Sequence, residues 1–172
     1  LNYNVISAFF QGLEENEALK DTVEVSRLVD EELSKLEERC KIYASSGIKP
    51  DKIDEDLVVV VGHGEVVYSN YAKFPTDYIN TNHIKNLDGG SGIVYLDEPI
   101  LIAAHSYDNE TLIIGEKLEK LLGKIAKLTG KSVALKEGKV NGLELRLVNS
   151  SYIVGLIPLK GLDNSKSSKY HL

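Results

Sequence analysis

The middle of the chain reads Leu57-Val-Val-Val-Val-Gly-His-Gly-Glu-Val-Val-Tyr-Ser69. Two β-branched runs are separated there by Gly62-His63-Gly64, and this pattern predicts a β-hairpin with a tight turn at its tip. A second pair of apolar runs follows, from Gly92 to Leu96 and from Ile100 to Tyr107, on either side of Asp97-Glu98-Pro99. The sequence therefore predicts two strand pairs, which form the centre of the fold.

A long helix is predicted before these strands, from Glu14 to Tyr43, because apolar or small residues recur there at steps of three and four. They are Leu19, Val23, Ser26, Val29, Leu33, Leu36, Cys40 and Tyr43. Such a helix, about 45 Å long, either packs along a whole domain or pairs with a copy of itself. Its dimer contacts would be Val23, Leu33, Leu36 and Cys40.

The segment between the two hairpins, Asn70 to Asn86, is polar. Within it, Pro75-Thr76-Asp77 predicts the start of a helix that runs from Tyr78 to Leu87. This segment leads from the first strand pair to the second.

Downstream of the hairpins, Thr111 to Gly115 predicts a fifth strand and Glu116 to Thr129 an amphipathic helix that ends at Gly130. Three runs with a period of two then predict antiparallel strands: Ser132 to Lys136, Leu143 to Val148 and Tyr152 to Ile157. The predicted class is therefore α+β, with a long N-terminal helix packed on an antiparallel sheet and an additional helix and three strands at the C-terminal end.

Composition excludes several classes of protein. The chain has 172 residues, of which 42% are hydrophobic, as expected of a globular domain. Its net charge of -6 argues against a nucleic-acid partner, because phosphate binding needs a basic surface. No apolar stretch approaches the roughly 20 residues that a membrane span requires, and the single Cys40 excludes an internal disulfide.

Catalytic and metal-binding patterns are not found in the sequence. The four histidines are His63, His83, His105 and His171, and their spacing is not that of metal ligands. No Gly-x-Ser-x-Gly motif occurs, so we expect neither an enzyme nor a cofactor. The alternative is a small hydrolase or transferase, which would need His105 or His83 to meet an acid such as Asp77.

The hairpin Val58 to Ser69 and the pair Gly92 to His105 resemble the extracytoplasmic Cache type of PAS-like sensor domain, to which CHASE-type domains are similar. Such domains occur in bacterial and archaeal sensor histidine kinases and chemoreceptors. The start, Leu1 to Glu38, resembles the periplasmic entry helix of nitrogen-regulation-type kinases. The chain departs from a single module after Gly115, where the added helix and strands imply a membrane-proximal half module or the completion of one sheet.

The resemblance implies four segments along the chain. Residues 1–50 would form a signalling helix, residues 51–115 a PAS-like sensor core, and residues 116–162 the additional helix and strands. Residues 163–172 would be a mobile tail.

The resemblance also implies a function. The chain would be the extracytoplasmic input domain of a membrane sensor histidine kinase, binding a small solute and transmitting a helix shift across the membrane. It starts at Leu1 without Met, and residues 1–10 are apolar and aromatic, so we expect flanking segments absent from this chain to tether it to the membrane. The alternatives are a chemoreceptor sensor domain and a non-enzymatic interaction or dimerisation domain.

The implied ligand site is the concave face of the sheet, closed by the Asn70 to Asn86 segment. Its candidate residues are Tyr71, Lys73, Asp77, Tyr78, Tyr95, His105 and Tyr107. Aspartate or tyrosine there would hold an amine, and Lys73 with His105 would hold a carboxylate. The alternative for the two strand tyrosines is an edge aromatic with a hydrated hydroxyl, and for His105 a hydrogen-bonded strand histidine. The ligand itself is not predicted.

Overall fold

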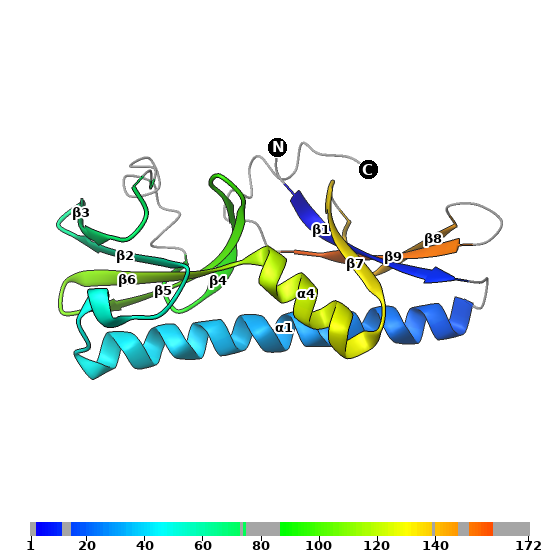
Figure 1. Cartoon of the computed structure of the whole chain (residues 1–172), viewed down its shortest axis with the longest axis horizontal. Coiled ribbons are helices and arrows are strands. Elements are labelled where there is room, and N and C mark those ends of the chain that lie inside the picture. The colour runs from blue at the N-terminus through cyan, green and yellow to red at the C-terminus, as the bar shows by residue number, and fades with distance from the viewer. Residues whose placement is uncertain are drawn as a thin grey trace. The chain divides into compact units, whose positions relative to one another are not determined.

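The computed structural model of the chain describes residues 3–11, 15–72, 74, 87–138, 140–147 and 152–159. Within these residues the fold is α+β, as predicted, with a long helix, a second helix and two antiparallel sheets of four and five strands (Figure 1). The predicted tail, 163–172, and all but the last residue of the helix predicted from Tyr78 lie outside the described residues.

The contacts divide the chain into two compact units. Unit 1 comprises Leu1–Glu32 and Glu119–Leu172, and unit 2 comprises Leu33–Leu118. The boundary between Glu32 and Leu33 lies inside the long helix. Unit 1 joins the two ends of the chain because its first strand pairs with strands near the C-terminus.

The long helix, α1, spans Glu15–Ser46, close to the predicted range. Neither glycine nor proline occurs in it, and two glutamates in the first turn, Glu15 and Glu17, complement the positive end of the helix dipole. Gly47 follows its last residue, and the φ of 70° at Gly47 suits a glycine after a helix C-terminus.

The predicted buried face of α1 is confirmed at Leu36 and Cys40 in unit 2 and at Val29 in unit 1. It is wrong at Leu19 and Val23, which are 47% and 49% exposed, and the other buried side chains of unit 1 are Ala18, Thr22 and Val25. Small side chains at Ala18 and Thr22 let the helix approach its sheet closely, which outweighs the greater hydrophobicity of leucine and valine.

Burial of Leu36 and Cys40 also corrects the dimer surface predicted from the heptad spacing. Both side chains pack inside unit 2, with 1% and 0% of their surface exposed. They are therefore unavailable to a second copy of the chain.

Unit 2 contains the predicted hairpins. Its strands are β2 (Leu57–Gly62), β3 (Glu65–Ser69), β4 (Ser91–Tyr95), β5 (Pro99–Tyr107) and β6 (Glu110–Lys117), with a short 3₁₀ turn, η1 (Pro50–Lys52), before them. All neighbours are antiparallel, in the order β3-β2-β6-β5-β4. The predicted tip of the first hairpin is confirmed, since His63 and Gly64 have φ values of 53° and 75°, as a two-residue type I′ turn requires.

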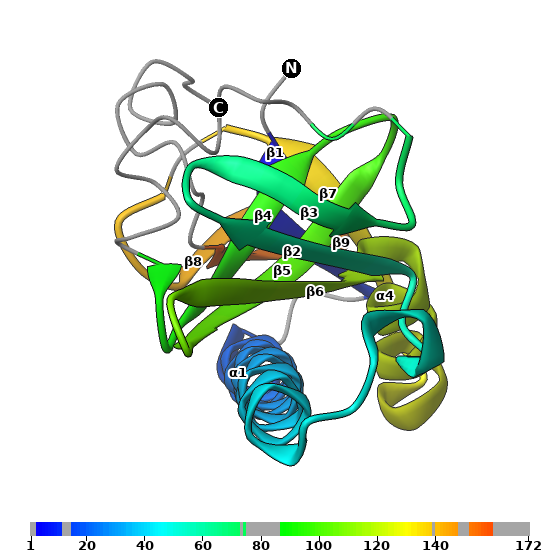
Figure 2. The same ribbon diagram turned by 90° about the vertical axis from the view of Figure 1, so that its left-hand side faces the viewer.

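The pairing register assigns the side chains of this sheet to its two faces. Ser91 pairs with Ala103, which pairs with Ile114, and paired residues point to the same side. The hydroxyl of Ser91 donates to Glu37 of α1, so this row faces the helix, which Figure 2 shows on one side of the sheet. On the other side Val59 is fully buried as well. Burial on both faces explains why β2 is a continuous apolar run.

Unit 1 contains the other sheet and the second helix, α4 (Leu118–Thr129), which begins at the unit boundary. Its strands are β1 (Tyr3–Gln11), β7 (Ser132–Glu137), β8 (Glu144–Leu147) and β9 (Tyr152–Pro158), in the order β7-β1-β9-β8. The three predicted C-terminal strands are present. The sequence missed β1, which was interpreted as the end of an anchored segment and instead pairs on both edges.

Candidate functional site

The structure describes four of the seven predicted ligand residues: Tyr71, Tyr95, His105 and Tyr107. The other three, Lys73, Asp77 and Tyr78, lie outside the described residues. The described part of the predicted site thus comprises three strand residues and Tyr71, which lies two residues beyond the end of β3.

Register places the three strand candidates on the face of the sheet that is turned toward α1. Tyr95 pairs with Pro99, and His105 and Tyr107 are an even number of residues beyond Ala103, which shares the helix-facing row of Ser91. The opposite face presents apolar, buried side chains at the sheet centre: Val59, Ile102 and Ile113.

The four candidates lie at two ends of the sheet. Tyr95 is next to the β4–β5 turn, and the Tyr71 hydroxyl accepts a hydrogen bond of 3.2 Å from the amide of Asp97 in that turn. Tyr107 lies eight residues from Pro99 along β5, or about 26 Å. The structure thus brings Tyr71 near Tyr95 and His105 near Tyr107, but it does not bring the two pairs together.

Tyr71 and Tyr107 are weakened as acids. Burial raises the pKa of Tyr71, and the neighbouring Asp97 contributes to the same shift. Burial also raises the pKa of Tyr107, whose hydroxyl donates to Glu110 at 3.4 Å. These phenols remain protonated donors at neutral pH, which suits recognition of a ligand oxygen better than base catalysis.

Polar contacts attach α1 to the sheet in unit 2. The Ser91 hydroxyl donates to Glu37 at 2.6 Å. Arg39 binds Glu55 at 2.7 Å and Glu116 at 3.7 Å. Partial burial opposes the charged form of Arg39, but the bonds to Glu55 and the charge of Glu116 raise its pKa. The helix is therefore tied to the edge strand β4, to the segment before β2 and to β6.

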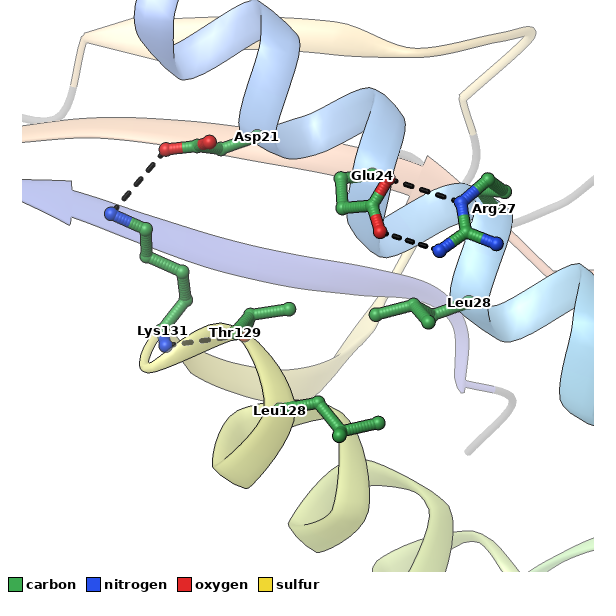
Figure 3. A pocket seen from close by; sticks show the side chains of 7 residues that line it. All are labelled: Asp21, Glu24, Arg27, Leu28, Leu128, Thr129 and Lys131. Atoms are coloured by element: carbon green, nitrogen blue, oxygen red, sulfur yellow. Dashed lines mark hydrogen bonds and ion pairs between the residues drawn. The ribbon is translucent and has the colours of Figure 1, made fainter.

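Unit 1 has a surface hollow of about 310 Å³ that the sequence did not predict (Figure 3). Its lining residues are Asp21, Glu24, Arg27 and Leu28 of α1, Leu128 and Thr129 at the end of α4, and Lys131. The two helices that supply its walls are about 100 residues apart along the chain, so no local pattern could have identified it.

Charged side chains of both signs pair around this hollow. Arg27 lies 2.6 Å from Glu24 and 2.8 Å from Glu31, and Lys131 lies 3.4 Å from Asp21. The hydrogen bonds between Arg27 and Glu24 lower the pKa of Glu24 and raise the pKa of Arg27. Figure 3 shows Leu28 on α1 and Leu128 on α4 beside these two pairs, so the lining has an aliphatic part as well as a charged one.

Metal binding has no support among the described residues, where no three His, Cys, Asp or Glu side chains gather closely enough to coordinate an ion. In the same part of the chain, we find no helix whose length and hydropathy would suffice to cross a membrane. The position of the chain relative to a membrane therefore remains an expectation from the sequence.

No protein-family model, curated protein or solved structure matches this chain. The likeness to Cache-type PAS-like domains thus stays a prediction from the hairpin pattern.

Proposed function

We propose that the chain is the extracytoplasmic input domain of a membrane sensor histidine kinase, which binds a small solute and transmits a shift along α1. In this proposal the domain performs no chemistry. Its output is a displacement of the helix, and helix shifts of about 1–2 Å are a known mode of switching.

The observation that carries the proposal is the hydrogen bond between Ser91 and Glu37. Ser91 is the first residue of β4 and is only 6% exposed, and the polar segment predicted to close the ligand site precedes it along the chain. Two hydrogen bonds hold the residues just before Ser91 to β5. Asp88 accepts one from the amide of Ser106, and the amide of Gly89 donates the other to the carbonyl of Ala104. A solute that moves the start of β4 would therefore act on α1 through a partly buried contact.

The strand order of unit 2 also supports the proposal. Its first and last strands, β2 and β6, pair inside the sheet, with β3 beyond β2 and the β5–β4 pair beyond β6. The resemblance rests on the two hairpins, β2–β3 and β4–β5, and the structure joins them in one antiparallel sheet. The order is a property of the fold, and a site on the fold has to supply the function.

A thermal-shift screen of the full chain tests ligand binding, with small carboxylates, amino acids, amines and inorganic anions as probes. A ligand that binds only the native state stabilises it by about 2.7 kcal/mol at a hundredfold excess over Kd. We expect a hit whose effect is reduced in Tyr95→Phe or His105→Ala. The matched control is His63→Asn, since His63 lies in an exposed turn and asparagine tolerates its positive φ.

Transmission needs a second measurement, hydrogen exchange of the α1 amides in residues 33–46 with and without the hit. We expect changed protection in this half of the helix, and loss of the change in Ser91→Ala with binding retained. A hit that leaves α1 protection unchanged in the unmodified chain would contradict the signalling role while leaving solute binding intact.

A further inference from the structure

The hollow of unit 1 offers a site separate from the sheet of unit 2. All of its lining residues belong to unit 1, and none is among the seven predicted ligand residues. Its volume of about 310 Å³ lies at the small end of the range for ligand sites. The chemistry of its walls indicates what class of molecule it suits.

Arg27 directs three of its five N–H donors to carboxylates. Its Nε and one terminal nitrogen donate to Glu24, at 3.0 and 2.6 Å, and its other terminal nitrogen donates to Glu31 at 2.8 Å. A guanidinium held between two carboxylates contributes little positive potential to the space beside it. A ligand carboxylate placed at Arg27 would also meet the like charges of Glu24 and Glu31.

Lys131 is likewise engaged. Its ammonium lies 3.4 Å from the Asp21 carboxylate and 5.4 Å from the centre of the Phe10 ring, over which it sits. The two cations of the lining are thus paired with its two carboxylates, Asp21 and Glu24, and Glu31, which lies outside the lining, adds a third carboxylate at Arg27. These five groups together carry one net negative charge. Carboxylate oxygens accept several hydrogen bonds each, so Asp21 and Glu24 keep acceptor capacity beside their ion pairs.

Helix α4 adds to this negative potential. It ends at Thr129, and Gly130, with a φ of 68°, caps it by donating its amide to Ala126. The C-terminal end of a helix carries a partial negative charge and favours cations. The Thr129 hydroxyl donates to the carbonyl of Ile125 and accepts from the amide of Lys131, so it is not a free donor for an anion.

The floor of the hollow is aliphatic. Leu128 is 63% exposed, the most exposed large apolar side chain among the described residues, and Leu28 lies beside it in the lining. An alkyl chain placed there would bury leucine surface that otherwise faces water, at about 25 cal/mol per Å². A ligand with a cationic head and an aliphatic chain therefore matches both the carboxylates and the leucines of the lining.

We infer that this hollow binds a small aliphatic ammonium ion, with its head at Asp21 and Glu24 and its alkyl chain on Leu28 and Leu128. The ion would be held by charge-assisted hydrogen bonds to the two carboxylates. Binding leaves the Arg27 and Lys131 pairs in place because the guest uses acceptor positions that they do not occupy.

The test is an NMR titration of the full chain with n-butylammonium, n-butanol and n-butyrate, which share a length and differ in charge. We expect the amides of Leu128 and Thr129 to shift most with butylammonium, more weakly with butanol and not with butyrate. The butylammonium effect decreases as NaCl is added, because salt screens exposed charges. Equal shifts with all three compounds, a preference for butyrate or no shift with butylammonium would overturn the inference.

Charge variants sharpen the test. Glu24→Gln removes one acceptor and frees two donors of Arg27, so we expect butylammonium to bind about three- to tenfold more weakly and butyrate binding to appear. Glu17→Gln is the matched control, since it removes an exposed glutamate from the same helix outside the hollow. If Glu17→Gln weakens binding as much as Glu24→Gln, the effect comes from overall charge and the inference fails.

The aliphatic floor is tested by Leu128→Ser, a change at an exposed position that leaves the charges in place. It should weaken butylammonium and butanol by a similar factor, with the circular dichroism spectrum unchanged. Unaltered affinity in Leu128→Ser would show that the alkyl chain does not lie on this residue.

Discussion

Gly155 of β9 lies so close to Thr22 of α1 that a Cβ atom on Gly155 would collide with the Thr22 hydroxyl and lie 2.9 Å from its Cγ2. Thr22 is fully buried, and its hydroxyl donates to the carbonyl of Ala18 at 2.7 Å. A glycine in the interior of a strand often marks a close approach of this kind. The contact determines which face of α1 packs on the sheet of unit 1.

Gly155→Ala should therefore destabilise the protein. The added methyl has no space because the Thr22 side chain that it would meet is fully buried, and overpacking of this kind costs about 1–3 kcal/mol. Urea unfolding followed by circular dichroism measures the change in the free energy of unfolding. The double variant Gly155→Ala with Thr22→Ala lacks the colliding hydroxyl and methyl, so it should recover part of the lost stability. We expect a coupling free energy between the two substitutions of about 0.5–3 kcal/mol.

The control for this prediction is Gly123→Ala in α4, where an added Cβ meets nothing within 4 Å. Gly123 is exposed and lies inside the helix, so alanine should raise stability by about 0.4–1 kcal/mol. If Gly155→Ala behaves like Gly123→Ala, the close approach of α1 to β9 is absent in solution.

A second prediction concerns the ion pair that anchors α1 in unit 2. Glu55 is only 8% exposed and depends on Arg39, which lies 2.7 Å away. Arg39→Ala leaves a nearly buried carboxylate without this partner, at a cost of about 1–3 kcal/mol. Arg39→Ala with Glu55→Gln should be less destabilised than Arg39→Ala alone, because the uncompensated charge is gone.

Arg27→Ala provides the comparison, since it removes the same side chain from the same helix. Arg27 is more than half exposed, and exposed ion pairs contribute little to stability. Denaturant midpoints of both variants, measured in low and high salt, distinguish the two sites, because salt screens the exposed Arg27 pairs more than the Glu55 pair. A loss in Arg27→Ala equal to that in Arg39→Ala would contradict the burial of the Glu55 pair.

A third prediction distinguishes core from surface along α1. Leu36 is 1% exposed and Val23 is 49% exposed, although the sequence placed both on one apolar stripe. Leu36→Ala should lower the free energy of unfolding by about 2–5 kcal/mol, whereas Val23→Ala should change it by less than about 0.5 kcal/mol. Equal effects would mean that the helix is rotated from the position described here.

The sequence was sufficient for the elements whose signals are local. The hairpin around His63 and the end of α4 at Gly130 both follow from turn and cap residues, and the structure has each where it was predicted. Periodicity also located the three C-terminal strands. Each of these features depends on neighbours along the chain.

The features that the sequence missed depend on residues far apart. Strand β1 pairs with β7 and β9, more than 120 residues away, so its role as an inner strand has no local signal. The buried face of α1 depends on Gly155, and the hollow on the end of α4. For the ligand site, residue type suggested Tyr95 and Tyr107, but only the register shows that they lie at opposite ends of the sheet.

A fourth prediction follows from Cys40, whose thiol donates to the carbonyls of Ala103 and Leu112. Burial raises the pKa of Cys40 to about 12, against a value of 9.0 without burial. The unfolded chain therefore releases this proton at a lower pH than the folded chain. The resulting stabilisation is complete below pH 9 and is lost as the pH rises toward 12.

The measurement is the free energy of unfolding of the unmodified chain minus that of Cys40→Ala, from pH 7 to 11.5. Other groups titrate in both proteins and cancel, so the difference should be flat to about pH 9 and then fall by at most about 1.4 kcal/mol per pH unit. Maleimide should label the thiol rapidly in urea and slowly in buffer at pH 8, because the thiolate is the reactive form. Rapid labelling of the folded protein, or a difference that stays flat to pH 11.5, would place Cys40 outside the core and remove the helix–sheet packing on which the proposed signalling depends.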